Sequence, residues 1–112
     1  MNNKSINKIG QESHEVNALN GWDVLTPAHW SPGDKEKERF LCTHMALIHT
    51  EVSEATEAIR HSDPSNFQEE LADTIIRITS IAYGLGIDID SVIAAKLAKN
   101  RTRGFRHGGK AL

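Results

Sequence analysis

Two pairs of carboxylates, each with its members three residues apart, constrain this chain more than any other feature. The first pair is Glu51 and Glu54, and the second pair is Glu70 and Asp73. Residues at this spacing are neighbours on one face of a helix, and the short turn expected at residues 61–66 makes the two helices antiparallel. At a rise of about 1.5 Å per residue, both pairs lie at a similar height. We therefore expect four carboxylates to converge between two helices.

Such a cluster needs a compensating positive charge, because uncompensated carboxylates repel one another strongly. Hard oxygen ligands favour Mg²⁺, with Mn²⁺ as the other option. The alternative is that all four acids are surface ion-pair residues. Against it, Glu51 falls inside the apolar stripe of its helix, where an ionised carboxylate costs several kcal/mol unless it is paired or liganded. Glu54 lies on the edge of that stripe, which Met45, Val52 and Ile59 widen.

The apolar residues follow a helical period through most of the chain and predict four helices. The isoleucine-rich run at 75–81 also fits a strand, but its continuity with the second acidic pair favours a helix. That helix has two apolar faces, so a second copy of the chain is expected to cover one of them. The fold class is therefore all-α, an antiparallel bundle of about four helices completed by homo-oligomerisation. The expected helices span residues 5–19, 34–61, 63 or 65 to 84, and 88–101, with a loop at 21–33.

Capping residues mark where the last two helices begin. One begins either at Asp63, followed by a proline at the first helical position, or at Ser65, which with Gln68 would form a capping box. The other is capped by Asp88 or Asp90.

Composition narrows the class of protein. A chain of 112 residues with a net charge of −2 is one small domain with no evident nucleic-acid or membrane partner. The single Cys42 fits a reducing compartment, and with no signal segment or apolar run of membrane-span length we expect a cytoplasmic protein. Charge is unevenly distributed, because basic residues but no Asp or Glu follow Asp90. The C-terminus is thus a basic arm.

The acidic pairs and a basic pattern downstream resemble the MazG-like family of all-α nucleoside triphosphate pyrophosphohydrolases. That family is marked by E-x-x-E on one helix, E-x-x-D on the next, and a later K-x-x-x-N-x-x-R. The similarity covers roughly residues 40–105, with departures at Thr50, Ser53 and Ala72. The matching positions are Glu51, Glu54, Glu70, Asp73, Lys96, Asn100 and Arg103.

The resemblance implies hydrolysis of (deoxy)nucleoside triphosphates to the monophosphate and pyrophosphate. It also implies dependence on Mg²⁺, with the four carboxylates as metal ligands, and assembly into a homodimer or homotetramer. On this interpretation the single domain has three parts. They are an N-terminal helix with a tryptophan-containing loop at 1–33, a MazG-like catalytic core at 34–103, and a basic flexible tail at 104–112.

Several side chains have expected roles beyond the metal. Glu54, on the stripe edge, is the carboxylate expected to orient or deprotonate the attacking water. Lys96, Asn100 and Arg103 are expected to hold the triphosphate, and the alternative for them is a solvated helix end whose cations favour the helix dipole.

Other residues have two interpretations. Trp22 and Trp30 are expected either to stack on the base or to pack at a subunit interface. Arg77 lies one turn after Asp73, which fits an ion pair or a phosphate contact equally well. His44 shares the Glu51 face and is expected to be a packed or hydrogen-bonded histidine rather than a ligand.

Two other classes of protein are alternatives to the hydrolase. A di-iron carboxylate bundle would need Glu-x-x-His pairs, and the acidic pairs here contain no histidine. A non-catalytic helical interaction or nucleic-acid-binding module using the basic C-terminal arm is the main alternative. Its signature would be salt-dependent binding to nucleic acid without metal.

Overall fold

Four helices make up the fold, which the computed structural model describes for residues 5–103. No strand occurs within that range, so the prediction of an all-α chain is confirmed. The predicted tail at 104–112 lies outside the described residues. The helices are α1 (Ile6–Leu19), α2 (Lys35–Arg60), α3 (Pro64–Gly84) and α4 (Ile89–Arg101), with a short 3₁₀ turn, η1 (Pro27–His29), before α2.

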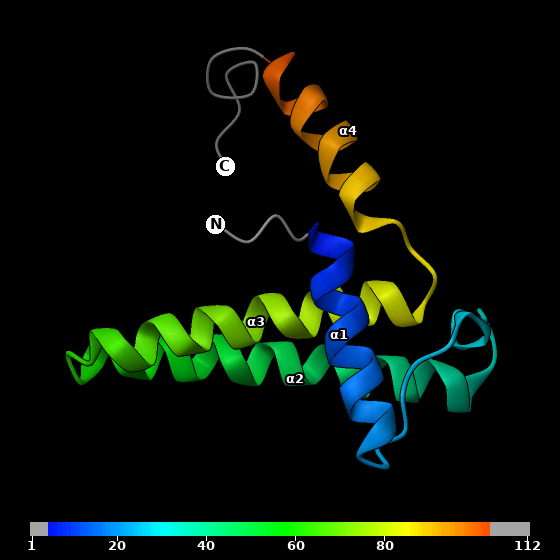
Figure 1. Cartoon of the computed structure of the whole chain (residues 1–112), viewed down its shortest axis with the longest axis horizontal. Helices are drawn as coiled ribbons and strands as arrows, with labels where there is room; N and C mark the ends of the chain where they lie inside the picture. Colours follow the sequence, from blue (N-terminus) through cyan, green and yellow to red (C-terminus); the bar gives the residue numbers. More distant parts are fainter. Residues whose placement is uncertain (1–4, 104–112) are drawn as a thin grey trace.

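Helices α2 and α3 form a long antiparallel hairpin, which lies horizontally in Figure 1. Ser62 in the turn has a positive φ of 51°, which reverses the chain directly after α2. The Asp63 side chain then accepts a hydrogen bond from the Asn66 amide at 3.0 Å, and Pro64 takes the first helical position. Of the two predicted starts of this helix, the one at Asp63 is therefore correct. The acidic pairs lie near this end of the hairpin, seven to ten residues from the turn at residues 61–63.

Helix α1 packs across α3 because a glycine lets the two backbones approach closely (Figure 1). Gly10 is buried, and a Cβ at this position would overlap the backbone carbonyl of Thr79. Thr79 is itself only 3% exposed, and its hydroxyl donates to the Ile75 carbonyl within α3. The crossing of α1 over α3 thus depends on the absence of a side chain at one position.

The loop between α1 and α2 is fixed to α3 by its most buried residue. Leu25 is 2% exposed, and its carbonyl oxygen lies 2.9 Å from Nε2 of His14 on α1. Gly84 at the end of α3 lies against Leu25, and a Cβ there would contact Leu25 at 2.9 Å. The loop therefore has a defined path, with Trp22 held at its start by a 3.0 Å bond from its amide to the Asn17 carbonyl.

Helices α1 and α4 cap each other at their N-termini. The Asp90 carboxylate accepts from the Ile6 and Asn7 amides at 3.0 and 3.1 Å. In return the Asn7 side-chain oxygen accepts from the Ile89 amide at 2.9 Å, and its nitrogen donates to Asp88. Asp88 caps α4, so of the two predicted caps Asp88 is the correct one and Asp90 instead serves α1. Hydrogen bonds from Asn7 and Ser91 lower the pKa of Asp88.

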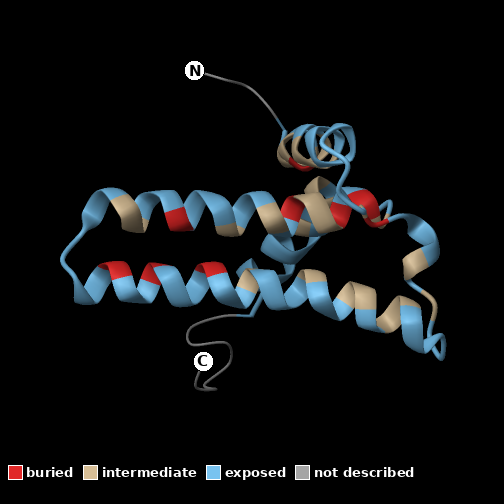
Figure 2. Cartoon of the chain, turned by 90° about the horizontal axis from the view of Figure 1, so that it is seen from below, coloured by how far each residue is buried: buried red, intermediate tan, exposed pale blue. Residues whose placement is uncertain are grey.

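The core of the single chain is thin, as Figure 2 shows. Among residues 5–103, few apolar side chains are buried, and most of these are alanines. Many large apolar side chains are instead exposed on α2 and α3. Met45, which widens the predicted apolar stripe of this helix, is 46% exposed, because the part of α2 that carries it is only partly covered. The buried apolar residues are Leu25, Ala55, Ala58 and Ala82, and the exposed ones include Val52, Ile59, Leu71, Ile75 and Ile78.

No single helix in the described range combines the length and the apolar character needed to cross a membrane. Only α3 and α4 taken together pass a test of length and composition, and they are bent by 112° relative to each other.

Candidate functional site

Three carboxylates converge where α2 faces α3. Glu51 comes from α2, and Glu70 and Asp73 come from successive turns of α3. One oxygen from each side chain lies within 4.8 Å of the others. Glu51 and Glu70 are buried, at 7% and 8% exposure, while Asp73 is exposed. The structure thus brings together three of the four residues that the two acidic pairs predicted would meet, and the cluster opens to the outside at Asp73.

The fourth predicted residue, Glu54, is exposed and lies outside this group of three. It nevertheless adjoins Glu70, because the Glu54 carboxylate is the largest influence on the pKa of that residue. Glu54 therefore lies at the rim of the cluster, one helical turn beyond Glu51.

Arg77 provides a positive charge in direct contact with the cluster. Its Nε donates to Oε1 of Glu51 at 2.8 Å, across the contact between α3 and α2. This ion pair, against the opposing effect of burial, lowers the pKa of Glu51. The partner of Arg77 is thus on the neighbouring helix rather than Asp73 on its own helix, the residue that its sequence spacing suggested.

Among residues 5–103, no arginine or lysine forms an ion pair with Glu70 in this way. The carboxylates of Glu54 and Glu51, together with burial, raise the pKa of Glu70 to about 7. Its Oε2 atom is buried and has no hydrogen-bond partner among the residues that the structure describes. A buried oxygen without a partner costs free energy, and a hard divalent cation shared with Glu51 and Asp73 would remove that cost. The residues present therefore fit Mg²⁺ or Mn²⁺.

We predict that the metal-free protein loses stability as the pH rises from about 5 to about 8. Unfolding returns Glu70 from a pKa of about 7 to its ordinary value of 4.5. Its stabilising contribution is therefore complete below pH 4.5 and is lost as the pH rises through about 7. The lowered pKa of Glu51 acts in the opposite sense, but only below its ordinary value of 4.5.

Urea unfolding in EDTA, followed by circular dichroism at several pH values, measures this dependence. Glu70→Gln should flatten it, whereas Glu69→Gln on the exposed side of α3 should not. If the free energy of unfolding of the wild type stays constant or rises between about pH 5 and about pH 8, the raised pKa of Glu70 is contradicted.

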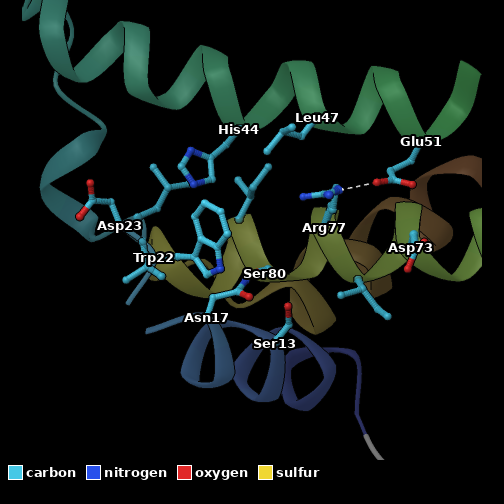
Figure 3. A pocket seen from close by; sticks show the side chains of 14 residues that line it. Ser13, Asn17, Trp22, Asp23, His44, Leu47, Glu51, Asp73, Arg77 and Ser80 are labelled. Atoms are coloured by element: carbon cyan, nitrogen blue, oxygen red, sulfur yellow. Dashed lines mark hydrogen bonds and ion pairs between the residues drawn. The ribbon is translucent and has the colours of Figure 1, made fainter. Parts of the chain in front are cut away.

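A pocket of about 530 Å³ extends from the carboxylates toward the loop between α1 and α2 (Figure 3). Glu51, Asp73 and Arg77 line one end, and Trp22, whose side chain is 71% exposed, lines the other. The pocket therefore joins an anionic cluster to an open aromatic surface. The remaining lining residues are Ser13, Asn17, Asp23, Val24, Leu25, His44, Leu47, Ile76, Ser80 and Ile81.

Four of the predicted substrate-binding residues do not line this pocket. Trp30 is 69% exposed, directly follows η1 and is not among the lining residues. Lys96, Asn100 and Arg103 are exposed on or just after α4, which points away from the hairpin in Figure 1. Their proposed role with the triphosphate stays a prediction, because one chain alone does not bring them to the carboxylates.

The pocket also contains residues that the sequence did not single out. Ser13 and Asn17 come from α1, Asp23 from the loop and Ser80 from α3. In the sequence, the only indication of this group is that Asp23 directly follows a tryptophan. The contact of α1 with α3, which brings the other residues to the pocket, has no local sequence pattern. His44 is as expected for a hydrogen-bonded histidine, with Nδ1 3.0 Å from the Phe40 carbonyl oxygen, and it lines the pocket as well.

Comparison with known proteins identifies the family of the domain in which this site lies. A family model described as MazG nucleotide pyrophosphohydrolase domain matches residues 41–105. The matched region includes the carboxylate cluster and α4, and it leaves α1 and the loop outside. No curated protein and no solved structure matches the chain.

Proposed function

Because the chain belongs to the MazG nucleotide pyrophosphohydrolase domain family, we propose that it hydrolyses (deoxy)nucleoside triphosphates to the monophosphate and pyrophosphate. The observation that carries this proposal is the group formed by Glu51, Glu70 and Asp73 at one end of an open pocket. Hydrolysis of a triphosphate depends mainly on positioning and on neutralising phosphate charge. A half-buried group of hard oxygen ligands beside a pocket is suited to both tasks.

Glu51, Glu70 and Asp73 would hold the Mg²⁺ ion, with Glu54 at the rim completing the four-carboxylate site. Bound there, the cation would neutralise the phosphates next to the scissile bond and lower the pKa of a coordinated water. Mn²⁺ would serve in the same way, because it also favours carboxylate oxygens.

Glu54 is the candidate general base of the reaction. It is exposed and lies at the rim of the cluster, where its carboxylate has access to water. The carboxylate would accept a proton from the attacking water while the new bond to phosphorus forms. The bond between phosphorus and the bridging oxygen then breaks, and pyrophosphate leaves with the electron pair.

We place the base of the nucleotide at the Trp22 end of the pocket. An exposed indole provides a flat apolar surface on which a base can stack. Asn17 and Asp23 lie beside it in the pocket lining and supply hydrogen-bonding groups that could select among bases.

We further propose that the protein functions as a homodimer or homotetramer. Large apolar side chains are exposed along α2 and α3, including Val52, Ile59, Ile75 and Ile78. Exposed apolar faces of this kind mark interaction surfaces. A second subunit could also bring Lys96, Asn100 and Arg103 of its α4 toward the triphosphate, which one chain alone does not do.

The function is tested with a panel of canonical and modified nucleoside triphosphates in the presence of Mg²⁺. The products should be monophosphate and pyrophosphate, and EDTA should abolish their formation. Release of single phosphates would instead indicate a phosphatase. Salt-dependent binding to nucleic acid without metal would favour a non-catalytic binding module.

Trp22→Ala is expected to raise the KM for the preferred triphosphate about tenfold with little change in kcat. Stacking of one base on an aromatic side chain contributes about 1–3 kcal/mol, and this contribution is made equally in the ground state and the transition state. Steady-state kinetics of pyrophosphate release measures both constants. Trp30→Ala is the matched control, because Trp30 is equally exposed but outside the pocket lining. An equal rise in KM for both variants would place the base elsewhere.

A further inference from the structure

Arg77 connects the carboxylate cluster to the rest of the pocket. Its side chain is 41% exposed, whereas the side chain of its partner Glu51 is only 9% exposed. Figure 3 shows the guanidinium extending from α3 into the pocket, where the dashed line marks its ion pair with Glu51 of α2. Both partners line the pocket, but the positive partner is much the more exposed of the two.

The ion pair uses only part of the guanidinium group. Nε is the atom that donates to Oε1 of Glu51, at 2.8 Å. An arginine side chain has five N–H donors, and its planar fork matches the oxygens of a phosphate group. The two Nη groups thus remain suited to an anion in the pocket while Nε remains bound to Glu51.

A cation bound by Glu51 would change this arrangement. Glu51 is buried and needs a positive partner, which Arg77 provides in the chain as it stands. A divalent cation shared with Glu70 and Asp73 would provide a stronger one. It would also repel a guanidinium bound to the same carboxylate, because like charges a few ångströms apart in a partly buried site interact strongly.

We propose that Arg77 is a phosphate-binding residue that exchanges partners: it neutralises Glu51 when the metal is absent, and it turns to the triphosphate when a cation binds the carboxylates. The proposal rests on the proposed function, because it needs both the cation and the triphosphate. It couples the two binding events, since an anion in the pocket gives Arg77 a new partner when the metal displaces it from Glu51. A purely structural ion pair would have no such coupling.

The test measures metal binding and nucleotide binding separately with the full chain. Mn²⁺ binding to EDTA-treated protein is followed by isothermal titration calorimetry, without nucleotide. Arg77→Gln should bind Mn²⁺ more tightly, by about fivefold or more, because a competing cation next to the site is removed. The same variant should bind a non-hydrolysable α,β-methylene nucleoside triphosphate, with Mg²⁺ present, about tenfold more weakly.

Two further variants keep the test decisive. Arg60→Gln removes an exposed arginine that pairs with Glu57 at 2.9 Å on α2, outside the pocket lining, and should change neither affinity. Arg77→Lys keeps the charge without the planar fork. It should bind Mn²⁺ like the wild type but bind the analogue more weakly, and it decides the question if Arg77→Gln does not fold.

An Arg77→Gln chain that folds but binds Mn²⁺ no more tightly, or binds the analogue as well as the wild type does, overturns the role of Arg77 alone. Wild-type protein that binds no Mn²⁺ overturns the proposed metal site together with it. The failure of this inference is thereby distinguished from the failure of the proposed function.

Discussion

Glu70→Gln is expected to reduce Mg²⁺-dependent pyrophosphate release by about a thousandfold while leaving the protein folded. A catalytic metal ion contributes several kcal/mol to transition-state stabilisation, and each 1.36 kcal/mol corresponds to about a tenfold change in rate. Glutamine keeps the shape of Glu70 but replaces one ligand oxygen by an amide nitrogen and removes the charge. The cluster then loses most of its affinity for the cation.

The same substitution should not destabilise the metal-free protein near neutral pH. Glu51 and Glu54 oppose the ionisation of Glu70 and raise its pKa to about 7. A neutral side chain removes that repulsion, so the free energy of unfolding at about pH 8 in EDTA should stay equal or increase. Activity is therefore lost while stability is kept or increased, which is typical of a group retained for function rather than for folding.

The activity is measured as pyrophosphate release at saturating Mg²⁺, and stability is measured by urea unfolding. Glu69→Gln is the matched control, since it removes one charge from an exposed neighbouring position on α3. A Glu70→Gln enzyme with wild-type activity would exclude Glu70 from the metal site. A variant that unfolds would instead show that the carboxylate is needed for the fold.

Gly10→Ala is expected to destabilise the protein by about 2 kcal/mol or more. An added Cβ would overlap the Thr79 carbonyl, so α1 would have to move away from α3, and overpacking of this kind typically costs about 1–3 kcal/mol. The sign of the change in stability is diagnostic, because alanine in a helix interior is otherwise favoured over glycine by roughly 1 kcal/mol. A loss of stability therefore indicates the close contact with α3. Displacement of α1 would also move Ser13 and Asn17, so the affinity for triphosphate should fall as well.

Equilibrium unfolding in urea measures the change, with Glu15→Ala as an exposed substitution on the same helix. That control should stay within about 0.5 kcal/mol of the wild type. A Gly10→Ala protein as stable as the wild type, or more stable, would show that α1 and α3 are further apart than the structure places them.

The features that sequence could predict are those encoded locally. The starts of α3 and α4 could be predicted to within two residues, at Asp63 or Ser65 and at Asp88 or Asp90, because capping depends on a few adjacent residues. The meeting of Glu51 with Glu70 and Asp73 follows from two helical spacings and one short turn. Local rules were therefore sufficient for the carboxylate end of the site.

The features that sequence could not predict depend on contacts between distant segments. The rule for residues four apart suggested Asp73 as the partner of Arg77, but that rule describes one helix and gives no information about α2. The Trp22 end of the pocket depends on how α1 crosses α3, which is determined by the single glycine at position 10. The direction of α4 likewise depends on Asn7, more than 80 residues earlier in the chain.

This last contact has a consequence for the order in which the chain folds. The bonds between the starts of α1 and α4 join residues 81 to 84 positions apart, whereas the α2–α3 hairpin closes through a short turn. Closing a long loop costs more chain entropy than closing a short one, so we expect these polar contacts to form after the hairpin. Interactions absent from the folding transition state act mainly on the rate of unfolding. The hydrogen bonds between the starts of α1 and α4 should thus affect mainly the rate of unfolding, and so the lifetime of the native state, and have little effect on the rate of folding.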